Sequence, residues 1–198
     1  MGHDTRSLWV LTCSIIPHKN VVQFSVADSV SEVSALTWDC VDLDKGLIIV
    51  DKILINKNQE WVLGTPKTSA SYREIKIGST LINILKNQKS RQRLNKLAYG
   101  EFYTRSNIVC TKENRVCVTP SSCKYSGSKL REVLKIDFNF HSLRHTHATL
   151  LLESGAKPKD IQARLGHSRI SITLDTYSHL TEKMQNETVD IFERAMYE

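Results

Sequence analysis

Residues Phe140 to Tyr177 carry the strongest structural signal in the chain and read FHSLRHTHATLLLESGAKPKDIQARLGHSRISITLDTY. The first half of this stretch predicts a helix, and Ser154-Gly155 supplies a glycine of the kind that ends a helix in the left-handed conformation. Pro158 is suited to the first turn of a second helix, and Gly166 is suited to its end. The pattern therefore predicts two consecutive helices with a sharp end to each.

Ionisable side chains gather along these helices. Five of the seven histidines of the chain lie in the 39 residues that begin at His141. His141 and Arg144 are three residues apart, so they share one face of a helix. His167 follows the second helix end, where a new helix start favours an anion, and Tyr177 lies ten residues later. A guanidinium grips phosphate oxygens, imidazoles donate to them, and nearby cations favour the tyrosine anion as a nucleophile. The combination predicts a phosphate site.

Two structural interpretations compete with this one. His141, His145 and His147 have a spacing that can bind a metal ion, but no cysteine or carboxylate in the same segment completes a tetrahedral set, which disfavours zinc. Tyr177 alone is also compatible with a packed aromatic side chain. A histidine-based phosphodiesterase fits the gap between His167 and the tyrosine poorly. The order and spacing of the residues, rather than any one of them, favour phosphate chemistry.

Length and composition limit the class of protein. The chain has 198 residues, enough for one domain, and it contains no run of 18 or more apolar residues that predicts a membrane span. Its five cysteines are irregularly spaced, as expected for a reducing cytoplasm. The segment from Lys57 to Lys135 carries a net charge of +11, whereas the rest of the chain carries −5. This asymmetry predicts a polyanionic partner such as DNA.

Outside the two helices already described, the sequence predicts one small sheet and several further helices. The expected strands are Leu47–Ile55, Trp61–Leu63 and Tyr72–Ile77, preceded by a turn over 41–46, and they suggest a small antiparallel sheet. The expected helices are Val30–Thr37, a helix capped by Ser79 that buries Leu81, Ile84, Leu85 and Leu94, a helix from Thr119-Pro120 toward Leu134, and two last helices near 173–177 and 181–197. The prediction is a predominantly helical α+β domain.

The segment His141–Thr149, continued by Leu165-Gly166-His167 and Asp175–His179, resembles the C-terminal signature of the tyrosine recombinases, the phage integrase family. In that family an H-x-x-R motif precedes L-G-H, and a tyrosine follows about ten residues later. Gly64–Thr68 is similar to the hairpin segment that carries the family's lysine, and Ser31–Trp38 is similar to the helix that carries its first catalytic arginine. The resemblance implies the DNA breaking-rejoining fold, with a three-stranded antiparallel sheet.

The resemblance also implies a role for each site residue. Tyr177 would attack a DNA phosphate and hold the 3′ end as a phosphotyrosine, while Lys67 would protonate the departing 5′ hydroxyl. His141, Arg144 and His167 would stabilise the phosphoryl oxygens. The reaction needs no metal and no nucleotide cofactor. It would serve integration and recombination of a mobile genetic element, on double-stranded DNA in the cytoplasm.

The expected DNA contacts lie on the predicted helix after the sheet and beside the lysine segment. They are Lys86, Lys89, Arg91, Arg93 and Arg73. The basic run on the helix is equally compatible with a solvated helix face. The final helix is expected either to pack on its own domain or, as the resemblance implies, to dock on a neighbouring copy on DNA.

Two departures from the family pattern stand out. Family members show G-x-R-x-x-E; Glu32 is in place here, but Ser29 stands at the arginine's position and Ala27 at the glycine's. Loss of one oxyanion donor costs about 10²–10³ in rate, so we expect impaired cleavage. Residues 1–28 match poorly, and the catalytic domain is expected over 29–198 without the family's arm-binding and core-binding domains. The alternatives are a DNA-binding remnant and a type IB topoisomerase-like relaxer.

Overall fold

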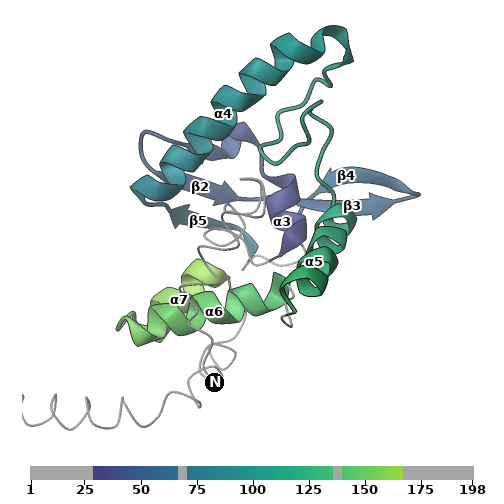
Figure 1. Ribbon diagram of the computed structural model, residues 1–198. Coiled ribbons are helices and arrows are strands. Elements are labelled where there is room, and N and C mark those ends of the chain that lie inside the picture. The colour runs from purple at the N-terminus through teal and green to yellow at the C-terminus, as the bar shows by residue number, and fades with distance from the viewer. Residues whose placement is uncertain (1–28, 67–70, 136–139, 167–198) are drawn as a thin grey trace, which may run out of the picture.

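The computed structural model describes residues 29–66, 71–135 and 140–166, without the side chains of 130, 133, 134 and 140–143 (Figure 1). The elements, in chain order, are α3 (Val30–Ala35), the 3-10 turn η1 (Trp38–Cys40), β1 (Val41–Asp42), β2 (Leu47–Val50), β3 (Ile53–Lys57), β4 (Glu60–Gly64), β5 (Arg73–Lys76), α4 (Ser79–Tyr99), the 3-10 turn η3 (Gly100–Phe102), α5 (Pro120–Leu134), α6 (Phe140–Glu153) and α7 (Pro158–Leu165). This confirms a mainly helical α+β domain with a small antiparallel sheet. The helices expected near 173–177 and 181–197 lie outside the described residues.

The sheet has the predicted number of strands but a different membership. Its order is β1-β2-β5, with both pairs antiparallel, while β3 and β4 form a separate two-stranded hairpin. The single strand expected over 47–55 is therefore wrong, and so is the placing of Val41 and Asp42 in a turn. The hairpin turns at Asn58 and Gln59, whose φ values of 50° and 67° match the tight turn that a two-residue hairpin loop requires.

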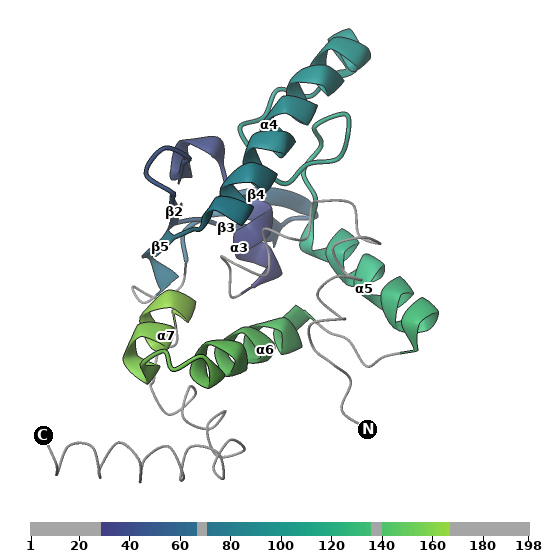
Figure 2. The same ribbon diagram turned by 60° about the vertical axis from the view of Figure 1, so that its left-hand side comes forward.

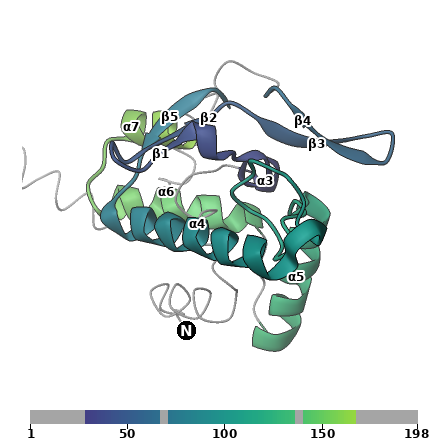
Figure 3. The same ribbon diagram turned by 90° about the horizontal axis from the view of Figure 1, so that it is seen from above.

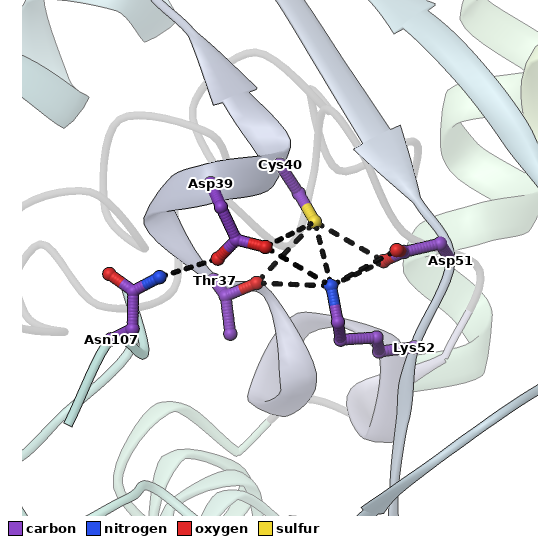
Figure 4. A network of polar contacts seen from close by, with 6 residues as sticks. All are labelled: Thr37, Asp39, Cys40, Asp51, Lys52 and Asn107. Carbon is purple, nitrogen blue, oxygen red and sulfur yellow. Dashed lines mark hydrogen bonds and ion pairs between the residues drawn. The ribbon is translucent and has the colours of Figure 1, made fainter.

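A polar network divides the two sheets at Asp51 and Lys52 (Figure 4). The Lys52 ammonium donates to an Asp51 carboxylate oxygen at 3.0 Å and to the Cys40 sulfur at 3.0 Å, and it pairs with Asp39 at 3.4 Å. The hydrogen bond with Cys40 raises the pKa of Lys52, and burial raises the pKa of Cys40. These side chains bind each other instead of continuing the strand, so the chain leaves the sheet here and enters the hairpin.

The main core lies between α3, the sheet and α4. Ile48, Ile75 and Leu85 are among its fully buried side chains, and Leu81 is buried beside them, as predicted. Leu94, however, is 66% exposed, so its predicted burial is wrong.

Two glutamines take the inward positions in the outer half of α4. Gln88 and Gln92 are buried, and the Gln92 amide donates to the carbonyl oxygens of Ile108 and Val109 at 3.2 and 3.0 Å. Here α4 faces an irregular segment whose backbone carbonyls need donors, rather than the apolar face of a sheet. Helical spacing alone cannot distinguish these two kinds of neighbour.

The predicted helix ends are largely confirmed. Thr119 accepts from the Ser122 N–H and Pro120 stands in the first turn of α5. Gly155 and Gly166 have φ values of 82° and 69°, as expected of glycines that end helices. Ser79 is not a cap, because the cap position of α4 is Gly78.

The helices lie against one face and one edge of the sheet. In Figures 1 and 2, β5 lies below β2 and α7 lies below the edge strand β5, whereas Figure 3 shows α4 and α6 on the same side of the strands. The view from above in Figure 3 shows the β3–β4 hairpin projecting from the body of the domain. Among the described helices, none combines the length and apolarity needed to cross a membrane.

Candidate functional site

The site is built on α6 and on the end of α7. Arg144 lies in the first half of α6 and is half-buried, and His141 lies three residues earlier on the same helix, so the two positions share a face. The side chain of His141 lies outside the described part of the structure.

A small apolar cluster fixes α6 against α7. Ala148 and Leu152 of α6 pack with Ile161 and Leu165 of α7, and all four side chains are buried. Gly166 then turns the chain in the left-handed conformation directly after Leu165. This packing orients the helix that carries Arg144 relative to the Leu165-Gly166 step of the predicted L-G-H motif. His167, Tyr177 and Lys67 lie outside the described residues.

His147 has a different character from a phosphate ligand. Burial, and then the positive charge of Arg164, lowers the pKa of His147 to about 4. Its imidazole is therefore neutral near pH 7. Arg164 donates to the Lys76 carbonyl oxygen at 2.9 Å, and burial lowers the pKa of its guanidinium. These two residues join α6, α7 and β5, and sequence reasoning gave Arg164 no role.

Ser29 caps α3. Its hydroxyl oxygen accepts a hydrogen bond from the Glu32 backbone N–H at 3.2 Å, and Ser29 itself is exposed. The residue at the expected arginine position therefore has a structural role of its own, as an N-cap.

The structure places Arg73, which was expected to contact DNA, in the interior of the domain. Its guanidinium is buried, with the residue 7% exposed, and it forms an ion pair with Glu32 at 3.0 Å. Its Nε donates to the Arg164 carbonyl oxygen at 3.2 Å, and Nη1 donates to the Ser71 carbonyl oxygen at 3.2 Å. The side chain points into the protein because Glu32, itself buried, requires a positive partner.

The basic residues of α4 differ in exposure. Lys86, Lys89 and Arg93 are exposed, whereas Arg91 is half-buried and donates to the Gln88 amide oxygen at 2.6 Å. The Lys89 ammonium also lies 5.3 Å from the centre of the Trp38 ring. In Figures 1 and 2, the outer half of α4 extends away from α6.

A second basic helix, α5, precedes α6 in the chain. On α5, Lys124, Lys129 and Arg131 are exposed, and so is Tyr125, with the Lys129 ammonium 5.2 Å from its ring centre. Five residues separate α5 from α6. The positive charge of the segment 57–135 was the available signal, but the charge balance alone does not distinguish this helix from α4.

The metal alternative depends on His141, whose side chain lies outside the described residues. Within the described side chains, no three histidine, cysteine or acidic residues gather as a set of metal ligands.

The model of the phage integrase family matches residues 15–184. The chain belongs to the phage integrase family. A tyrosine recombinase XerC-like protein of Caldanaerobacter subterraneus is 29% identical over 202 residues, covering 96% of this chain and 49% of that protein. The ICEBs1 integrase of Bacillus subtilis is 29% identical over 168 residues, covering 80% of this chain and 43% of that protein. The chain thus spans about half the length of these curated relatives.

Solved structures of integrases and recombinases share the fold. The Tn1549 transposon integrase, in complex with a circular intermediate DNA, superposes with a TM-score of 0.71 at 20% identity, covering 88% of this chain and 58% of that one. XerA recombinase gives a TM-score of 0.68 at 20% identity, covering 97% of this chain and 64% of that one. The integrase fold expected from the sequence is therefore confirmed.

Proposed function

We propose that this chain is the catalytic part of a site-specific tyrosine recombinase, which cuts and rejoins double-stranded DNA through a 3′-phosphotyrosine. The observation that carries the proposal is the packed pair of helices α6 and α7. Arg144 lies on α6 and α7 ends at Gly166, in a chain whose residues 15–184 match the phage integrase family. In the sequence, the H-x-x-R, L-G-H and tyrosine positions follow one another with the family's order and spacing.

In the proposed reaction, the Tyr177 oxygen attacks a phosphorus atom of the backbone. The bond between phosphorus and the 5′ oxygen breaks as the new bond between phosphorus and the tyrosine oxygen forms. Lys67 gives a proton to the departing 5′ oxygen. Arg144 remains charged at all relevant pH values and can hold two phosphoryl oxygens at once. His141 and His167 donate to the same oxygens. Rejoining reverses these steps with a 5′ hydroxyl as the nucleophile.

The absence of an arginine at position 29 makes the proposed cleavage slow. The serine there caps α3 and carries no charge to offset the developing negative charge on the phosphate. A DNA-binding remnant that no longer cleaves is the second candidate, and the Ser29 cap is the observation that favours it.

We further propose that the DNA lies along the α5 and α6 side of the domain. The exposed Lys124, Lys129 and Arg131 support this path, because α5 precedes α6 by only five residues, whereas the outer half of α4 extends away from α6. Each lysine on such a path neutralises one phosphate and adds to the salt dependence of binding. Self-association on DNA through the C-terminal segment belongs to the same proposal.

The test is covalent trapping on a nicked suicide DNA drawn from sequences that flank the gene. The expected result is a protein–DNA adduct that survives denaturant and disappears in Tyr177→Phe. Tyr125→Phe is the matched control, since it removes the hydroxyl of an exposed tyrosine on α5 and should leave the adduct in place. An adduct retained in Tyr177→Phe would contradict the proposed nucleophile. DNA binding without any adduct would favour the remnant.

A further inference from the structure

Arg73 joins three separate elements through one buried guanidinium. Its Nη2 pairs with Glu32 of α3 at 3.0 Å, its Nη1 donates to the Ser71 carbonyl oxygen at 3.2 Å, and its Nε donates to the Arg164 carbonyl oxygen of α7 at 3.2 Å. Both charged side chains are less than 10% exposed. The three donors leave one rigid plane in different directions, so the guanidinium sets the relative positions of its partners.

A second arginine strengthens the same junction. Arg164 of α7 donates from its own side chain to the Lys76 carbonyl oxygen of β5 at 2.9 Å. The side chain of each arginine thus binds the backbone of the other's element. This two-point attachment fixes the end of α7 against the edge strand β5, which pairs only with β2 in the described sheet.

Each partner of Arg73 is close in sequence to a position of the proposed active site. Glu32 lies three residues after Ser29, Ser71 lies four residues after Lys67, and Arg164 lies three residues before His167. Arg73 therefore acts on the segments that lead to these positions: it binds the Ser71 and Arg164 backbone and the Glu32 side chain of α3.

We infer that Arg73 is a positioning residue for DNA cleavage. It fixes the relative positions of the segments that lead to His167, Lys67 and Ser29. This inference rests on the proposed function. It gives Arg73 an inward role in the reaction in place of the DNA contact that its position after Lys67 suggested. The inferred role requires the shape of the guanidinium as well as its charge, since an ammonium cannot bind all three partners in fixed directions.

A purely structural role predicts a different outcome from a positioning role. Any buried polar residue stabilises the fold, and its loss lowers stability. Gln92 provides the matched control: it is also buried, and its side chain also donates to two backbone carbonyls. It lies in the outer half of α4, which extends away from α6. Gln92→Leu should destabilise the domain and leave the cleavage step unchanged.

The experiment compares the full chain with Arg73→Gln, Arg73→Lys and Gln92→Leu on the suicide substrate. Three quantities are measured: the first-order rate of adduct formation at saturating DNA, the Kd for the same DNA, and the urea midpoint of unfolding. Displacement of reacting groups by about 1 Å costs about 10²-fold, so Arg73→Gln should slow the rate about 10²-fold. We expect the Kd to stay within about threefold, and Arg73→Lys to recover part of the rate, because it keeps the charge beside Glu32.

Two results would overturn the inference. One is an adduct rate in Arg73→Gln equal to that of Gln92→Leu, which would leave Arg73 a structural role alone. The other is a weakened Kd with an unchanged rate at saturation, which would make Arg73 a DNA contact after all.

Failure of the proposed function is recognised separately, because the unmodified chain then forms no adduct. In that case hydrogen exchange decides the positioning role. The Gly166 N–H, which bonds the Gln162 carbonyl at the end of α7, should exchange faster in Arg73→Gln than in Gln92→Leu. Equal exchange in the two variants would end the inference.

Discussion

Replacing Ser29 with arginine should change stability and activity in opposite directions. The change removes the hydroxyl that accepts the Glu32 N–H at 3.2 Å and places a positive charge at the start of α3. Loss of the cap costs about 1 kcal/mol, and a cation at a helix N-terminus costs about 0.5 kcal/mol more. The sum corresponds to a fall of about 3–6 °C in Tm for a domain of this size.

The same guanidinium would supply the missing phosphate donor. A preorganised donor to a transition-state oxyanion is worth about 10²–10³ in rate, so Ser29→Arg should form the Tyr177 adduct about 10²-fold faster than the unmodified chain. Ser29 is exposed, which leaves room for the longer side chain. Adduct formation on the suicide substrate and urea unfolding measure the two effects in the same preparations.

Ser29→Ala separates the cap from the guanidinium. It should lose about 1 kcal/mol of stability with no gain in rate, because it removes only the hydroxyl. Equal adduct rates in Ser29→Arg and Ser29→Ala would refute the assignment of position 29 to the active site. A stability of Ser29→Arg equal to that of the unmodified chain would refute the capping argument.

Two further outcomes are expected. Because folding lowers the pKa of His147 from 6.5 to about 4, the unfolded chain binds a proton that the folded chain does not over this range, and stability should fall as the pH drops from about 6.5 to 4. His147→Gln should remove about 2 kcal/mol of that fall in urea unfolding across the range, and an unchanged pH dependence would contradict the buried neutral imidazole. In DNA binding measured against salt, Lys124→Ala with Lys129→Ala should reduce the slope of log K by about 2, while Lys86→Ala with Arg93→Ala should leave it unchanged; the reverse result would place the DNA on α4.

Helix ends were predicted well because their signals are local. Thr119-Pro120, Gly155 and Gly166 act through their own backbone preferences, and the helices begin and end there as expected. The sheet was predicted less well because apolar, mostly β-branched residues run from Leu47 to Ile55 and are interrupted only at Asp51 and Lys52. The strand ends where Asp51 and Lys52 form polar contacts with each other and with Cys40 of η1. Strand propensity does not predict such contacts.

The sequence predicted the motif residues of the site, but not the buried contacts that position them. Arg144 lies on the predicted helix, and the family is confirmed by the match over residues 15–184. The inward turn of Arg73 depends on a buried carboxylate 41 residues earlier in the chain. Similarly, the direction in which the outer half of α4 extends, away from α6, depends on tertiary packing, which charge patterns do not encode. The roles of Lys67, His167 and Tyr177 remain predictions.

The division of one apolar run into two sheets has a consequence for how this domain can change over generations. The β3–β4 hairpin pairs with itself alone among the described strands, and its tip at Asn58 and Gln59 is exposed. Adding or removing one residue from each arm near the tip shifts neither the register of β2 against β5 nor the anchored junction at Lys52. The hairpin is therefore a module: its length and tip can diversify, and with them any contacts made there, while the frame that holds the candidate site is inherited intact.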